Sequence, residues 1–166
     1  MTGKAWVLGA NIDTDALAPG KYMHLSLADI ATHCLEDLRP DFAPGVRPGD
    51  VLVGGENFGI GSSREQAAAA LREMGIKAVI APSFAGIFYR NAFNLGLPAL
   101  ICADALTIAE GDAVDVDFAA GEIRNLTRGQ TLATPPLPPL LVSLIEAGGL
   151  LAHLKSQSQP DGATSD

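Results

Sequence analysis

Short apolar runs recur along the first two thirds of the chain, and polar or glycine-rich segments separate them. Four of these runs have the length and composition of buried strands: residues 5–9, 51–53, 77–81 and 98–102. The segments between them carry helical patterns. Strands that alternate with helices predict an α/β fold with a partly parallel sheet, connected by right-handed crossovers.

Three helices are expected between these strands. The first follows Ser26, a suitable N-cap, and its apolar residues keep helical spacing through residue 38. The second is an alanine-rich stretch that Gly75 ends. The third starts at Ser83 and ends at Gly96, with a core face formed by Phe84, Ile87, Phe88 and Leu95.

The pattern changes after residue 108. Residues 113–118 alternate between apolar and polar with period two, which predicts a half-exposed strand. Residues 121–123 and 130–132 suggest further short antiparallel strands. A smaller antiparallel part should therefore follow the parallel one.

The end of the chain should form one more helix and a tail. A stiff proline-rich connector, residues 135–139, leads to an amphipathic helix over residues 140–154, which we expect to continue through its glycine pair. The polar residues 155–166 are expected to be disordered. Residues 1–154 then form a single domain, in keeping with the chain length.

Composition excludes several classes of partner. A net charge of −8 over 166 residues argues against nucleic acid or an anionic membrane as the main partner. The chain has no apolar stretch long enough to span a membrane and no signal-peptide core near its first residue. Cys34 and Cys102 do not form a CxxC motif, so we expect reduced, buried thiols in a cytoplasmic protein.

Residues 54–65 are the stretch richest in chemistry. Four glycines allow a ligand to approach the backbone closely. Ser62 and Ser63 each stand three residues before a Glu or Gln, the capping-box pattern that opens a helix. Hydroxyls, free N–H groups and a helix dipole together predict an anion site.

The simpler alternative is a serine-capped helix behind a flexible loop. Arg64 favours the anion site, because a cation in the first turn of a helix is unfavourable unless an anion binds nearby. The stretch is neither a Walker loop nor a dinucleotide fingerprint. It lacks the Gly-Lys-Ser/Thr of the first and the third glycine of the second.

Three motifs, in order along the chain, resemble the swivel domain of the aconitase superfamily: residues 11–15 (NIDTD), 56–65 (ENFGIGSSRE) and 81–98 (APSFAGIFYRNAFNLGLP). A free-standing chain of this length is similar to the small subunits of 3-isopropylmalate dehydratases. The resemblance covers roughly residues 4–105 and implies a three-layer swivelling β/β/α domain.

The resemblance also implies an activity. The expected enzyme is a hydro-lyase that interconverts 2-isopropylmalate and 3-isopropylmalate by dehydration and rehydration in leucine biosynthesis. Homoaconitase-type and other alkylmalate dehydratases, acting on citraconate or dimethylmalate, remain alternatives. A non-catalytic carboxylate-binding regulatory module is an alternative of a different class, because fold alone does not establish function.

Roles for individual residues follow from the same resemblance. Ser62 would be the catalytic base, because a serine alkoxide becomes accessible where amides and a cation stabilise it. Ser63 and Arg64 would hold substrate carboxylates, Arg64 in a bidentate manner. The residue types of the turn at residues 11–15 favour a structural role, whereas the resemblance implies that the turn borders the site; whether it touches substrate is left open.

Residues 20–25 form the loop in which substrate choice is expected to lie, and its substrate-binding candidates are Tyr22, Met23, His24 and Leu25. Relatives that bind a third carboxylate carry an arginine where this chain has His24. The apolar Met23 and Leu25 instead suit an alkyl group.

The cofactor is expected in another chain. Two cysteines cannot supply the ligands of a [4Fe-4S] cluster, so neither a metal nor a cofactor site is predicted here. The resemblance places the cluster in a large subunit, which would join this chain in a heterodimer or heterotetramer. The substrate would be a small di- or tricarboxylic hydroxyacid.

Overall fold

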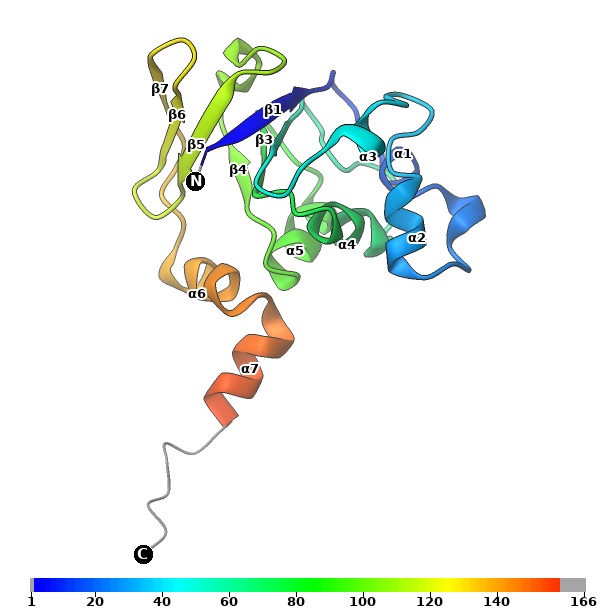
Figure 1. The fold of residues 1–166 in the computed structure, drawn as a ribbon. Coiled ribbons are helices and arrows are strands. Elements are labelled where there is room, and N and C mark those ends of the chain that lie inside the picture. The colour runs from blue at the N-terminus through cyan, green and yellow to red at the C-terminus, as the bar shows by residue number, and fades with distance from the viewer. Residues whose placement is uncertain (1, 159–166) are drawn as a thin grey trace, which may run out of the picture.

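The computed structural model describes residues 2–158. A seven-stranded mixed sheet runs through it in the order β4-β3-β2-β1-β5-β6-β7 (Figure 1). The parallel strands are β1 Gly3–Val7, β2 Val51–Val53, β3 Ala78–Ala81 and β4 Ala99–Ile101. The antiparallel strands are β5 Ala113–Asp117, β6 Glu122–Asn125 and β7 Gln130–Ala133. The predicted partly parallel sheet with an antiparallel extension is therefore confirmed.

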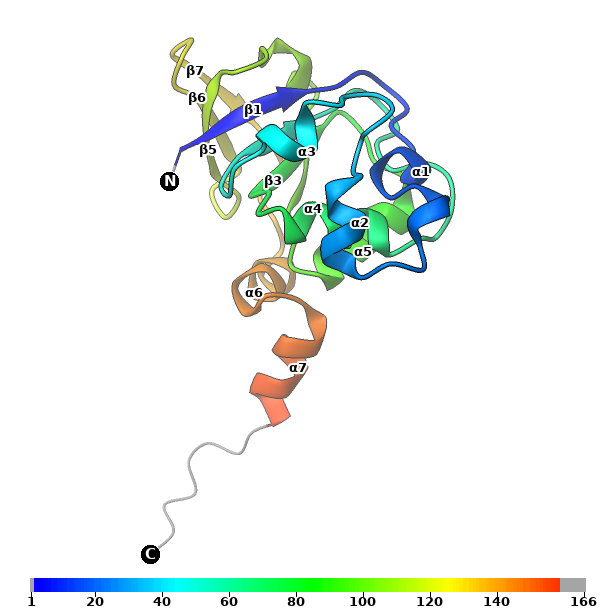
Figure 2. The same ribbon diagram turned by 45° about the vertical axis from the view of Figure 1, so that its right-hand side comes forward.

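Helices connect the parallel strands and follow the antiparallel ones. They are α1 Thr14–Leu17, α2 Leu27–Thr32, α3 Phe42–Gly45, α4 Gln66–Glu73, α5 Gly86–Asn94, α6 Pro139–Ala147 and α7 Leu150–Ser158. Single 3-10 turns occur at Gly20–Tyr22 and Ala105–Thr107. Figures 1 and 2 show α4 and α5 beside the parallel strands and α6 and α7 leading away from them.

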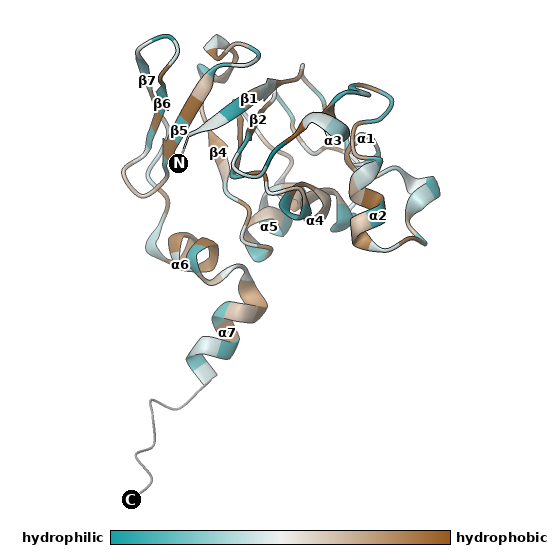
Figure 3. Ribbon diagram, viewed as in Figure 1, coloured by the Kyte–Doolittle hydropathy of each residue, from teal (hydrophilic) through white to brown (hydrophobic). Residues whose placement is uncertain are grey.

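The central strands are buried on both faces, which gives the fold its layers. Leu52 and Val79 face the core that they share with the helices. Val51 and Val53 face a second core, closed by Val114, Val116 and Ile123 of β5 and β6. Residues of alternating direction on one strand thus serve two cores, as expected for a β/β/α arrangement. Hydrophobic residues also predominate along α6 (Figure 3).

Helix α2, the first of the three helices predicted between the strands, is shorter than its apolar stripe predicts. Ser26 caps it as expected, its hydroxyl accepting from the Asp29 N–H at 3.2 Å. However, α2 ends at Thr32 instead of reaching residue 38. Leu35 takes a positive φ of 60°, and its N–H donates to the Ala16 carbonyl at 2.9 Å. This contact turns the chain toward α1, so burial of Leu35 is achieved by an irregular turn.

Helix α5, the third of the helices predicted between the strands, starts later than predicted. The Ser83 hydroxyl accepts from the Asn57 N–H at 2.9 Å and does not cap α5, which begins at Gly86. Ile87 is 42% exposed, while Ala92 and Phe93 join Phe88 in the core. The predicted core face was therefore wrong at Ile87. The end of the helix at Gly96 is confirmed by its positive φ of 77°.

The expected final helix is two helices. Gly148 and Gly149 have φ values of 87° and 125°, which end α6 and turn the chain into α7. The helix predicted to pass through this pair was therefore wrong. Helix α7 continues to Ser158, so residues 155–158 of the expected disordered tail are helical. The rest of that tail lies outside the described residues.

Candidate active site

Three loops meet where the parallel strands β1, β2 and β3 end. The Asn11 N–H donates to the Glu56 carbonyl at 2.8 Å, and the Phe58 N–H donates to the Ser83 carbonyl at 3.1 Å. The three sequence motifs are thereby brought side by side. In open α/β sheets, ligands bind outside the carboxyl ends of the strands, where these loops lie.

A pair of asparagines joins two of these loops. Asn11 and Asn57 both adopt the left-handed backbone conformation, with φ values of 58° and 59°. The Asn57 side-chain amide donates to the Asn11 side-chain oxygen at 3.1 Å. Left-handed non-glycine residues cluster at functional sites, because the surrounding structure has to support their strain.

Buried phenylalanine rings hold the glycine-rich motif, residues 56–65, in place. Phe58 is fully buried and makes edge contacts with the rings of Phe84 and Phe88. Gly59, at φ +86°, passes so close to Phe88 that a Cβ would lie 2.2 Å from Phe88 Cγ. A side chain at this position would collide with a buried ring, so the loop requires glycine here.

The two serines do not cap the following helix. Helix α4 begins at Gln66, and Glu65 occupies the N-cap without a side-chain hydrogen bond. The predicted capping boxes were therefore wrong. The Ser62 hydroxyl instead lies 3.1 Å from Thr14 Oγ1 and accepts from the Arg64 N–H at 3.3 Å. The chain turns tightly at these residues before the helix starts.

Thr14 is the residue that organises Ser62. It is buried, and its Oγ1 accepts from the Ser62 N–H at 3.1 Å. Since that bond uses Thr14 as an acceptor, its own proton is available for Ser62 Oγ. A negatively charged Ser62 oxygen would thus receive two donors, the Thr14 hydroxyl and the Arg64 N–H, an arrangement that stabilises an alkoxide.

Arg64 reaches back toward the N-terminal motif. Its Nη1 lies 3.2 Å from Asp15 Oδ1 and 2.8 Å from the Ala18 carbonyl. Asp15 Oδ1 also accepts from the Gly20 N–H at 2.9 Å. That N–H, together with the Arg64 guanidinium, holds the pKa of Asp15 below its usual value. A guanidinium has five donors, so these contacts of Nη1 are compatible with carboxylate binding.

Thr14 and Asp15 belong to the turn that its residue types suggest as structural and that the resemblance implies to border the site. Their residue types agree with turn formation, and only contacts with residues almost fifty positions later give them a place in the site. Asn91 of α5 also gains a place beside the site through a contact with a residue distant in sequence. Its side-chain amide donates to the Ser63 carbonyl at 3.3 Å and thereby ties exposed Ser63 to α5.

The candidate substrate loop is ordered by its own contacts. Met23 and Leu25 are partly buried against the helix-side core, and the Tyr22 ring stacks on His33. His24 is the exposed member of the four. The loop starts beside Arg64, since a Cβ at Gly20 would lie 3.5 Å from Arg64 Nη2.

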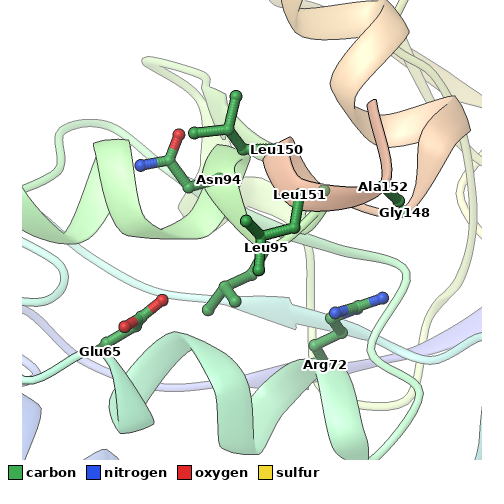
Figure 4. A pocket seen from close by; sticks show the side chains of 9 residues that line it. Glu65, Arg72, Asn94, Leu95, Gly148, Leu150, Leu151 and Ala152 are labelled. Carbon is green, nitrogen blue, oxygen red and sulfur yellow. The ribbon is translucent and has the colours of Figure 1, made fainter. Parts of the chain in front are cut away.

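A separate hollow of about 320 Å³ lies between α4, α5 and the start of α7 (Figure 4). Arg72 and Glu65 reach it from the α4 side, and Leu150 and Leu151 from α7. Glu65 directly follows Arg64, so the hollow is adjacent to the loop in sequence. Its lining does not include Ser62, Ser63 or Arg64.

The described residues contain no group of three or more His, Cys, Asp or Glu side chains that could hold a metal ion. Cys34 and Cys102 are both buried, and burial raises the pKa of each thiol above its usual value. Two separate protonated thiols do not fit an iron–sulfur cluster. None of the described helices has the length and apolar character that a membrane crossing requires.

Known proteins resemble this chain in sequence and structure. Residues 43–104 match the Aconitase C-terminal domain family. The 3-isopropylmalate dehydratase small subunit of Wolinella succinogenes is 51% identical over 156 residues, which cover 93% of each chain. The methanogen homoaconitase small subunit of Methanothermobacter thermautotrophicus is 47% identical over 152 residues, 91% of this chain and 88% of that one.

A solved structure also relates the chain to 3-isopropylmalate dehydratases. The crystal structure of 3-isopropylmalate dehydratase from Methanocaldococcus jannaschii superposes with a TM-score of 0.89 at 43% identity, covering 94% of this chain and 93% of that chain. Both the sequence matches and this structure extend well beyond the three motifs that carried the first resemblance. The chain therefore belongs to the family of 3-isopropylmalate dehydratase small subunits, within the aconitase group.

Proposed function

We propose that this chain is the small subunit of a cytoplasmic two-subunit hydro-lyase that isomerises 2-isopropylmalate and 3-isopropylmalate. Ser62 is its catalytic base, and Ser63 and Arg64 hold the substrate carboxylates. The large subunit carries a [4Fe-4S] cluster, which acts as a Lewis acid on the departing hydroxyl when substrate binds. The observation that carries the proposal is the position of Ser62 Oγ, which lies 3.1 Å from Thr14 Oγ1 and accepts from the Arg64 N–H at 3.3 Å.

The reaction requires a proton to leave the carbon next to a carboxylate. Ser62 takes that proton as an alkoxide, whose charge the Thr14 hydroxyl and the Arg64 N–H stabilise. Arg64 grips the adjacent carboxylate, which holds this carbon toward Ser62. After elimination, Ser62 returns the proton to the neighbouring carbon during rehydration, and the hydroxyl has changed position.

The exposure of the site supports a second subunit. Ser62 and Ser63 are solvent-exposed on the edge formed by the three loops. Alkoxide chemistry needs a closed site from which water is excluded. A large subunit laid over this edge would supply both the enclosure and the cluster, for which the described residues hold no fitting ligand set.

The side chains of the loop at residues 20–25 favour one substrate over the other. A tricarboxylate would need a cation for its third carboxylate, and a charge-assisted hydrogen bond of this kind contributes about 1.5–3 kcal/mol. His24 is the exposed member of the four candidate residues, with Met23 and Leu25 on either side, and the loop's cation, Lys21, is paired with Glu36 at 3.7 Å. We therefore favour 3-isopropylmalate. Homocitrate is the second candidate, because a methanogen homoaconitase small subunit is 47% identical to the chain.

The deciding experiment reconstitutes the chain with its iron–sulfur large subunit and compares wild type with Ser62→Ala. Wild type should turn over 3-isopropylmalate with a higher kcat/KM than homocitrate. Ser62→Ala should assemble normally but lose a factor of about 10²–10⁴ in kcat, as expected for removal of a proton-transfer group. Ser143→Ala, at a half-exposed serine of α6, is a matched control that should keep full activity.

Each alternative predicts a different result. Near-full kcat in Ser62→Ala would mean that Ser62 is not the base. A wild-type complex that prefers homocitrate would identify the homoaconitase-type enzyme. A chain that binds malate-like acids but gives no turnover with any large subunit would support the non-catalytic binding module.

A further inference from the structure

The loop at residues 20–25 is attached to helix α2 through a cluster of four side chains: Lys21, Tyr22, His33 and Glu36. The Tyr22 and His33 rings are stacked, with centroids 3.7 Å apart and planes inclined by 12°. His33 Nδ1 lies 2.7 Å from Glu36 Oε2, and Lys21 Nζ lies 3.7 Å from Glu36 Oε1. Two loop residues are thus attached to two residues that follow α2.

The ionisation of this cluster agrees with its geometry. Tyr22 donates its hydroxyl to Glu36, which raises the pKa of Tyr22. The same hydrogen bond, followed by the contact with His33, lowers the pKa of Glu36. Glu36 therefore stays ionised and accepts from its neighbours. The side chain of His33 is 32% exposed, so it is partly buried between Tyr22 and Glu36.

The residue before this cluster is tied to the candidate active site. Asp15 Oδ1 accepts from the Gly20 N–H at 2.9 Å and from Arg64 Nη1 at 3.2 Å. The loop therefore starts beside Arg64, its next two residues contact Glu36 and His33, and His24 follows Tyr22 by two residues. A shift of Lys21 and Tyr22 would move His24 relative to Arg64.

We propose that His33 is a positioning residue: by stacking on Tyr22 and bonding Glu36, it holds the substrate loop in place and thereby sharpens the choice of substrate. This inference rests on the proposed function, because it needs that loop to face the variable part of the substrate. His33 itself acts through Tyr22 and touches no reacting atom.

The test uses the reconstituted two-subunit enzyme with His33→Ala and His33→Phe. His33→Ala should raise the KM for 3-isopropylmalate about tenfold, change kcat less than about threefold, and narrow the preference over homocitrate by a similar factor. His33→Phe keeps a ring against Tyr22 and should recover most of the loss. His153→Ala is the matched control, because this half-exposed histidine lies on α7, and it should behave as wild type.

Tyr22→Ala gives an independent arm. If the ring stack is the contact that holds the loop, each single variant removes the same interaction. The double variant Tyr22→Ala, His33→Ala should then have a KM and a substrate preference no further from wild type than those of either single variant. Hydrogen exchange of the backbone amides of residues 20–26 measures the loop directly and does not depend on enzyme activity. The Met23 and Leu25 N–H groups bond the Gly20 and Tyr22 carbonyls, and they should exchange faster in either variant.

Several results would overturn the inference. For His33→Ala, the contradicting results are an unchanged KM and substrate preference, or an equal loss of kcat for both substrates. For the double variant, it is a change in KM equal to the combined changes of the two single variants. For Tyr22→Ala, it is unchanged amide exchange in the loop. If Ser62→Ala also remains active, the proposed function fails as well. If Ser62→Ala is inactive while His33→Ala matches wild type, only the role of His33 is refuted.

Discussion

At the scale of single residues, the candidate site depends on a buried threonine as much as on the exposed serine that it contacts. Thr14 is 2% exposed, and its hydroxyl contacts Ser62 twice: it accepts from the Ser62 N–H and lies 3.1 Å from Ser62 Oγ. A hydroxyl so placed orients the serine and supplies a donor to it. The same residue type in an ordinary turn would have neither effect.

Thr14→Val should therefore impair catalysis, although valine has nearly the same shape. It removes a donor to Ser62 Oγ and leaves the Ser62 N–H without its acceptor, and loss of one oxyanion donor typically reduces kcat by about 10²–10³. Thr14→Ser retains the hydroxyl and should keep most of the turnover. Steady-state kinetics on the reconstituted enzyme checks both; equal activity in the two variants would remove Thr14 from the mechanism.

At the scale of elements, the site is formed by loops that are held against the sheet and α5. Phe58, in the chain from β2 to α4, packs against Phe88 of α5, and the loops after β1 and β3 flank this segment through backbone hydrogen bonds. Gly59 lets this segment approach α5. The position of Ser62 thus depends on packing several residues away.

Gly59→Ala should destabilise the protein by at least about 2 kcal/mol, because it combines a left-handed backbone conformation with a collision against buried Phe88. Gly9→Ala is the control. A Cβ there would meet nothing within 4 Å, so its effect should stay within about 0.5 kcal/mol. Urea unfolding of both variants measures the difference, and similar stabilities would show that the loop repacks without cost.

At the scale of the whole molecule, ionised carboxylates join parts of the chain that are distant in sequence. Asp112 accepts from the Asn125 amide at 2.7 Å, the Ala109 N–H at 2.9 Å and Arg128 Nε at 2.9 Å. These contacts, the Asn125 amide first, lower the pKa of Asp112. They connect the start of β5 with β6 and the turn that follows it, and so fasten the antiparallel part of the sheet.

The pH dependence of stability follows from the sign of this shift. A carboxylate whose pKa is lower in the folded state stabilises the fold above its unfolded pKa, and this stabilisation is lost as the pH falls through the folded pKa. The melting temperature should therefore be nearly constant between about pH 5 and 8 and fall below about pH 4. Asp112→Asn should be less stable at pH 7 and show a smaller acid-induced decrease. Thermal unfolding from pH 3 to 8 tests this, and a decrease that begins near pH 6 in wild type would contradict it.

The sequence by itself determined most of the strands and several helix ends. Runs such as Val51–Val53 can only be buried on both faces, so their residue types identify central strands without further context. Gly75 and Gly96 end their helices because each takes a left-handed conformation that other residues adopt with difficulty. The resemblance of three motifs to a known family also led directly to Ser62, Ser63 and Arg64 as the site to examine.

Only the tertiary structure decided which side chains meet. Thr14 and Ser62 are 48 positions apart; the parallel pairing of β1 with β2 brings them together, and no local pattern encodes that contact. The same holds for Arg64 with Asp15. Likewise, α2 stops early because the Leu35 N–H finds the Ala16 carbonyl, which frees His33 to meet Tyr22. Propensity and periodicity act within a few residues, whereas these contacts depend on the register of strands that are distant in sequence.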